Sequence, residues 1–183
     1  MAIRRRCLGA TLVLGLAGSG VSSAREQSQA DPHYPQGRKV FDGDRGTSLS
    51  SARISRGLKE QILNSLVESF TDPADRKFVA DQTMVLPMSL GDYPHSVLRV
   101  WGGGGACGAT GNCEIALFDR ETQRMLLSAN GWEFRILSAS HSGLHDVQVR
   151  QNMGCCSGIR YVYRFEGRSY RLAKQVDEVI STP

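Results

Sequence analysis

The sequence predicts an α+β fold in which an N-terminal amphipathic helix packs on an antiparallel β-meander of about six or seven strands. Apolar residues recur at helical spacing between residues 51 and 73. From residue 96 onward, short stretches alternate apolar and polar residues, and turn residues separate them at close intervals. Such closely spaced strands are typical of antiparallel sheets, and the preceding helix makes the class α+β.

The predicted helix follows Ser55, whose hydroxyl can cap a free backbone amide of the first turn. Thr71-Asp72-Pro73 is expected to end it, because proline disfavours helical geometry in the residue before it. Its apolar stripe consists of Leu58, Ile62, Leu63, Leu66, Val67 and Phe70. Such a stripe usually packs on the sheet of its own domain.

Seven segments after residue 95 read as strands, and several alternate cleanly between apolar and polar residues. In one of them Tyr161, Tyr163 and Phe165 share a face opposite Arg160 and Arg164. One face of the sheet is therefore expected to stay polar. The predicted ranges are 96–101, 114–120, 124–129, 133–138, 145–151, 159–166 and 169–174.

Residues 1–24 have the three parts of a secretory signal peptide: an arginine run (Arg4 to Arg6), an apolar stretch, and small residues that end at Ala24. The apolar stretch is shorter than the ~20 residues that a bilayer span needs. We expect cleavage before Arg25 and a periplasmic or secreted protein. After cleavage we expect no integral membrane span.

Cleavage also changes the charge and the domain organisation. It takes 3 of the 22 Lys and Arg residues and leaves 19 against 18 Asp and Glu, a net charge of +1. No run of basic residues survives, so we expect no nucleic-acid partner. Residues 25–50 are polar and predict a flexible lead-in. Residues 51–183 then form a single disulfide-bearing domain.

The mature chain has four cysteines, Cys107, Cys113, Cys155 and Cys156, and an even number in an oxidising compartment predicts disulfides. Their spacing leaves the connectivity open. The first pair can close a small loop, with a vicinal bond between the adjacent second pair. Alternatively, the two loops are cross-linked, or thiols remain reduced. Four soft ligands for zinc or copper(I) are another alternative, disfavoured because the usual two-residue spacer is missing.

His141 and His145 form a histidine cluster that Asp146 follows. Ser142-Gly143 between them predicts a turn, so the pair lacks the helical spacing of metal ligands. No nucleophile elbow is present, and the carboxylates are scattered along the chain. The sequence thus favours a non-enzymatic protein, with no catalytic residue, cofactor or metal predicted.

Three motifs follow one another in the C-terminal half: the loop CGATGNC (107–113), the turn GLHDV (143–147) and the closing hairpin YRFEGRSY (163–170). Together they resemble a group of small uncharacterised exported bacterial proteins with a CGxGGC-like hairpin and a closing Y-x-F-(D/E)-G-x-x-Y hairpin. The resemblance implies an extracytoplasmic β-domain without known catalysis. The adjacent Cys155 and Cys156 depart from that pattern.

We predict a small exported binding or interaction module that presents cysteine-stapled loops to a protein or an envelope component. Rigid loops suit this role because they lose little entropy on association. Trp101, Trp132, His141 and His145 are the candidate binding residues, although tryptophans also suit a core. The alternative is a thiol-redox or soft-metal-binding envelope protein centred on Cys155-Cys156.

Overall fold

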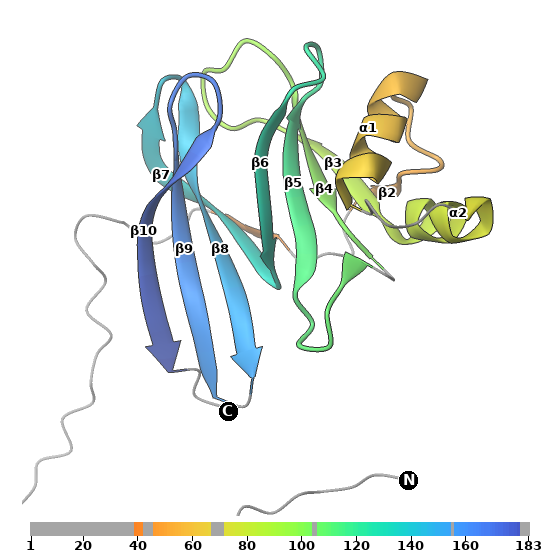
Figure 1. Ribbon diagram of the computed structural model, residues 1–183. Coiled ribbons are helices and arrows are strands. Elements are labelled where there is room, and N and C mark those ends of the chain that lie inside the picture. The colour runs from red at the N-terminus through yellow and green to blue at the C-terminus, as the bar shows by residue number, and fades with distance from the viewer. Residues whose placement is uncertain (1–38, 42–45, 67–71, 104–105, 155, 180–183) are drawn as a thin grey trace, which may run out of the picture.

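Within the described part of the chain, two five-stranded antiparallel sheets and two helices make up the fold (Figure 1). The computed structural model describes residues 39–41, 46–66, 72–103, 106–154 and 156–179. The predicted signal peptide and most of the predicted lead-in lie outside these residues. In sheet A the strand order is β1-β7-β8-β9-β10, and in sheet B it is β2-β3-β4-β5-β6.

All seven predicted strands are present within a few residues of their expected bounds, and β1, β2 and β3 are additional. Sheet A contains β1 (Lys39–Phe41), β7 (Glu133–His141), β8 (Leu144–Gly154), β9 (Ser157–Phe165) and β10 (Tyr170–Val179). Sheet B contains β2 (Thr47–Ser48), β3 (Met84–Met88), β4 (Val97–Trp101), β5 (Cys113–Asp119) and β6 (Met125–Gly131). The helices are α1 (Arg56–Leu66) and α2 (Pro73–Gln82).

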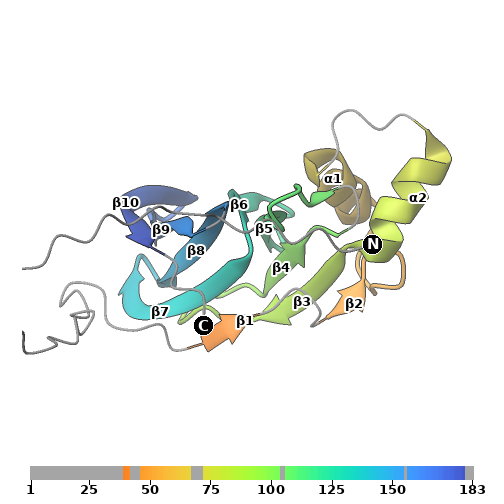
Figure 2. The same cartoon turned by 90° about the horizontal axis from the view of Figure 1, so that it is seen from below.

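Sheet B is the middle of three layers, with the helices on one face and sheet A on the other (Figure 2). Every residue of β4 is buried. Its Leu98 and Val100 belong to the core under the helices, whereas Val97 and Trp101 belong to the core between the sheets. The expectation of a single meander under one helix is therefore corrected. The strands divide between two sheets, and two helices cover the far face of one of them.

The change of sheet occurs where β6 passes into β7 at Gly131. A Cβ at this position would lie 2.5 Å from both the Arg150 carbonyl oxygen and Val149 Cγ1. Only glycine permits this approach, because real Cβ atoms do not come so close to backbone. The chain can therefore leave sheet B and enter sheet A within two residues, which the alternating pattern of its side chains does not indicate.

The helix prediction is confirmed at its start. Ser55 Oγ accepts a hydrogen bond from the Leu58 N–H at 3.1 Å, which caps α1. Asp72 and Pro73, expected to end this helix, instead begin α2: Asp72 caps it by accepting from the Ala74 N–H at 2.7 Å. Proline is favoured at a first helical position, so the same dipeptide suits either role. Val67, Phe70 and Thr71 lie outside the described residues.

Two strands lie inside the range predicted as a flexible lead-in. β1 pairs with β7, and β2 pairs with β3, so sheet pairing begins well before residue 51. Leu49, which follows β2, is fully buried in the core under the helices. The short apolar stretches around these residues carry too little alternation to indicate a strand.

The outer face of sheet A is polar, as the alternation predicts. Tyr163 and Phe165 pack toward the core between the sheets, and the intervening Arg164 is exposed. On the outer face Arg150 donates to Glu178 at 2.8 Å and to Glu133 at 3.0 Å. Arg160 also pairs with Glu178. Paired charges thus cover the side of sheet A that no described helix covers.

Candidate functional site

Polar and reactive side chains gather at the two opposite ends of the strands. At the disulfide end lie the described residues of the β4–β5 loop (102–103 and 106–112), the β6–β7 joint at Trp132, the end of β8 and the start of β9. At the histidine end lie the β3–β4 loop (89–96), the β5–β6 turn (120–124) and the β7–β8 turn (142–143). Figure 1 shows the two ends at the bottom and the top of the molecule.

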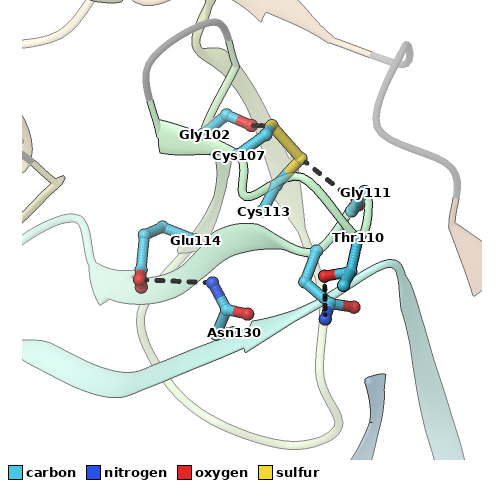
Figure 3. The surroundings of a disulfide bond; sticks show 8 residues. Gly102, Cys107, Thr110, Gly111, Cys113, Glu114 and Asn130 are labelled. Carbon is cyan, nitrogen blue, oxygen red and sulfur yellow. Dashed lines mark hydrogen bonds between the residues drawn. A yellow bond between two sulfur atoms is a disulfide. The ribbon is translucent and has the colours of Figure 1, made fainter. Parts of the chain in front are cut away.

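The disulfide joins Cys107 to Cys113 at the base of the β4–β5 loop (Figure 3). The Gly102 carbonyl oxygen lies 3.3 Å from Cys107 Sγ, so the staple also contacts the end of β4. This pairing decides among the connectivities that the spacing left open, because it excludes a cross-link from either cysteine to Cys155 or Cys156. Cys156 is exposed, and Cys155 lies outside the described residues.

Hydrogen bonds, rather than a second disulfide, join the β4–β5 loop to the end of β8. The Asn112 side-chain amide donates to the Asn152 carbonyl oxygen at 2.7 Å, and the Asn152 N–H donates to Asn112 Oδ1 at 2.8 Å. The Asn152 side chain donates in turn to the Thr110 carbonyl oxygen at 3.1 Å. A loop of sheet B and a strand of sheet A are thereby held in one arrangement.

Exposed apolar side chains lie beside this junction. Trp132 is 39% exposed and Met153 is 54% exposed. The Arg150 guanidinium lies 5.1 Å from the centre of the Trp132 ring, a cation–π contact. Burial opposes the charge of Arg150, but its bonds to Glu133 and Glu178 raise its pKa. The ring therefore has a permanently charged, immobilised neighbour.

At the histidine end the β3–β4 loop crosses from sheet B to sheet A. The His145 N–H donates to the Leu90 carbonyl oxygen at 2.6 Å, which attaches the loop to the start of β8. A Cβ on Gly91 would lie 2.8 Å from the Gly143 carbonyl oxygen, so glycine allows the contact. This crossing brings Tyr93 and His95 to the end of β5.

Asp119, the last residue of β5, is fully buried and receives hydrogen bonds on both oxygens. Its Oδ1 accepts from the backbone N–H groups of Glu121 and Thr122 at 3.0 and 2.9 Å. Its Oδ2 accepts from the Tyr93 hydroxyl at 2.8 Å and lies 2.7 Å from His95 Nδ1. The carboxylate therefore holds the β5–β6 turn and the crossing loop together.

Ionisation of Asp119 follows from these contacts. Burial opposes the charge, but the hydrogen bonds from His95, the Thr122 N–H and Tyr93 outweigh it and hold the pKa of Asp119 well below its usual range. The same pairing raises the pKa of Tyr93, after the larger effect of burial. Asp119 is thus a carboxylate at neutral pH and Tyr93 a hydroxyl donor.

A second histidine–carboxylate pair lies at the same end. His141 Nδ1 is 2.7 Å from Asp146 Oδ1, and Asp146 is fully buried. The Tyr170 hydroxyl donates to the His145 carbonyl oxygen at 2.7 Å. Burial, and then the charge of Asp146, raise the pKa of Tyr170. The turn predicted between His141 and His145 is present, and Gly143 adopts a positive φ of 90° there.

The structure separates the four predicted binding residues. Trp101 is 7% exposed and belongs to the core between the sheets. Trp132 lies at the disulfide end, whereas His141 and His145 lie at the histidine end. Sequence reasoning missed the pair of His95 and Asp119 because 24 positions separate them. An aspartate opening a turn was the available signal, since such side chains bond backbone two residues on.

No protein-family model, curated protein or solved structure matches the chain. Neither described helix has the length and apolar character required to cross a membrane. The side chains at the disulfide end and at the histidine end are therefore the basis for proposing what the protein does. The disulfide end offers a surface that is stapled, hydrogen-bonded and partly apolar. The histidine end offers oriented carboxylates and imidazoles.

Proposed function

We propose that the protein is an exported binding module whose disulfide end recognises a protein partner. The main support for this proposal is the reciprocal hydrogen bonding of Asn112 and Asn152 beside the Cys107–Cys113 disulfide. Together these interactions attach residues 107–113 of sheet B to β8 of sheet A. A surface that is rigid before binding loses little conformational entropy when a partner docks.

The side chains at this end support a protein partner. Tryptophan, methionine and arginine are enriched at protein interfaces, and tryptophan and arginine dominate their binding energy. Trp132 and Met153 are exposed there, and Arg150 lies over the tryptophan ring. Because Arg150 is already held by Glu133 and Glu178, its side chain has little rotamer freedom left to lose.

An immobilised mature domain, residues 25–183, can test this proposal against an envelope extract. We expect a partner to bind the wild type and to be lost with W132A/M153A. The matched control is F78A, since Phe78 is 55% exposed but lies on α2, on the face of sheet B opposite to sheet A. Thermal unfolding of each variant verifies folding. Equal capture by the double variant and the control would contradict the proposed surface.

Export is proposed on the signal-peptide pattern of residues 1–24 and on the disulfide, which persists in oxidising compartments. Expression of the full chain in a bacterium, followed by fractionation and N-terminal sequencing, tests it. We expect a periplasmic or secreted product that begins at Arg25. An uncleaved chain that stays in the cytoplasm would refute export.

A thiol-redox function at Cys155 and Cys156 is the second candidate. The pairing of Cys107 with Cys113 favours it, because in the mature chain Cys155 and Cys156 are then left only each other as intramolecular disulfide partners. A bond between neighbours is strained and reduces readily. Mild reductant followed by alkylation and intact-mass measurement should then modify two cysteines. If it modifies none, the redox function is excluded.

A further inference from the structure

Three metal-ligand side chains converge at the histidine end, apart from the proposed binding surface. One donor atom each of His95, Asp119 and Glu121 lies within 4.8 Å of the other two. His95 comes from the β3–β4 loop, and the two carboxylates come from the end of β5 and the turn after it. Among the described residues no other group of three histidine, cysteine or acidic side chains is as close.

Both carboxylates are oriented by groups that do not themselves ligate. Two backbone N–H groups and the Tyr93 hydroxyl hold Asp119, as described above. Glu121 Oε2 accepts from the Ser96 N–H at 3.0 Å, which turns this side chain toward His95. Hydrogen bonds of this kind orient metal ligands and tune their affinity in known metal sites.

A cation can take the place of the hydrogen between His95 and Asp119. A neutral imidazole carries one ring hydrogen, and moving it from Nδ1 to Nε2 frees the Nδ1 lone pair. That lone pair then faces Asp119 Oδ2, which lies 2.7 Å from Nδ1 in the structure. A cation that binds both atoms relieves their repulsion, and its bonds of about 2.0–2.2 Å to each atom require the two to move slightly farther apart. Asp119 keeps its other three hydrogen bonds, so the fold of the turn does not depend on the exchange.

Exposure and donor type specify the class of metal. Asp119 is buried, whereas the His95 side chain is 36% exposed and Glu121 is exposed. The ligands thus lie at the surface, where water can complete the coordination shell. One imidazole nitrogen with two carboxylates suits divalent transition metals such as Zn²⁺, whereas Ca²⁺ and Mg²⁺ prefer oxygen alone.

We propose that His95, Asp119 and Glu121 form a surface site for one divalent transition-metal ion. The second histidine–carboxylate pair provides the contrast. His141 and Asp146 have the same 2.7 Å separation, but no third ligand joins them among the described residues. A histidine–carboxylate pair without a third ligand is not expected to bind the metal. Metal binding should therefore be seen at His95 and not at His141.

The test is titration of the metal-free mature protein with ZnCl₂, followed by isothermal calorimetry and by the NMR signals of the histidine rings. We expect one equivalent to bind and to perturb His95 first. H95Q and E121Q should each weaken binding at least tenfold. E121Q keeps an oxygen for the Ser96 N–H and lies at the surface, so it removes the charge without unfolding the turn.

The matched control is H141Q, which should bind Zn²⁺ as the wild type does. C155S/C156S should also bind normally, which separates this site from a thiol site. The proposal is overturned if wild type binds no Zn²⁺, if H95Q and E121Q bind as tightly as wild type, or if H141Q or C155S/C156S loses binding to the same extent. Tighter binding of Mg²⁺ or Ca²⁺ than of Zn²⁺ would also overturn it.

Discussion

Asn112 in the β4–β5 loop and Asn152 in β8 exchange two hydrogen bonds across the two sheets, at 2.7 and 2.8 Å. Asn112 is 7% exposed, so water has little access to compete for its amide. The Asn112 side chain thereby takes the place of backbone pairing where β8 runs beyond β7, since the register of these two strands stops at Glu133 and Arg150. The β4–β5 loop is joined to β8 without a covalent bond, and the adjacent disulfide closes that loop alone.

Replacing Asn112 with alanine should destabilise the protein by about 1–3 kcal/mol, because the N–H and carbonyl of Asn152 both lose their partner. Urea unfolding followed by tryptophan fluorescence measures this change. The control is N130A, since Asn130 donates only to Glu114, at 3.3 Å. If both variants lose equal stability, the pair does not join the loops as proposed.

Removing the staple with C107S/C113S should cost about 2 kcal/mol, the chain-entropy contribution of so short a loop. The two residues are 6 positions apart. Thermal unfolding measures the loss, and intact mass after alkylation follows the remaining cysteines. We expect the state of Cys155 and Cys156 to stay as in wild type. New alkylation at either one would show that the two pairs exchange.

Asp119 should make the stability of the fold depend on pH in the acid range. Its pKa is lower in the folded protein than in the unfolded chain, where it is about 4. The ionised form therefore stabilises the fold above about pH 4, and this contribution is lost as the pH falls toward the folded pKa. We expect D119N to be less stable than wild type at pH 7, with a difference that shrinks below about pH 4.

Chemical denaturation of D119N and wild type at pH 7, 5 and 3 measures this difference in stability. EDTA is included so that no bound metal ion contributes to it. The control is D81N: Asp81 pairs only with the exposed Lys77 and the solvent-facing Ser50, so its removal should change little at any pH. A D119N deficit that is equal at pH 7 and pH 3 would contradict the role assigned to the ionised carboxylate.

Gly131 should tolerate no side chain. G131A places a methyl group 2.5 Å from the Arg150 carbonyl oxygen, and we expect a loss of roughly 1–3 kcal/mol or more from overpacking. The matched control is G57A at the second position of α1, where the nearest atom is a flexible Gln123 side chain at 3.4 Å. That variant should be neutral or slightly more stable. Differential scanning calorimetry compares them, and equal melting temperatures would contradict the close approach.

Local elements could be predicted because their signals lie in neighbouring residues. Alternation identified β9 from Tyr161, Tyr163 and Phe165, and the capping hydroxyl of Ser55 identified the start of α1. In contrast, α2 carries only two buried residues, Val79 and Ala80, so its apolar stripe is too narrow to indicate a helix. β3 was also missed, because its residues are apolar toward both neighbouring layers, so apolar and polar residues do not alternate along it.

The amino-acid sequence by itself determined the strands after residue 95, the first helix and the cysteine pairs that could close a loop, because propensity and spacing act over a few residues. Only the tertiary structure decided that Cys107 is bonded to Cys113, that the chain passes from sheet B to sheet A at Gly131, and that His95 contacts Asp119. These outcomes depend on contacts between residues far apart in the chain, which become neighbours only when the sheets pack. The spacing of residues along the chain does not indicate which distant residues will come into contact.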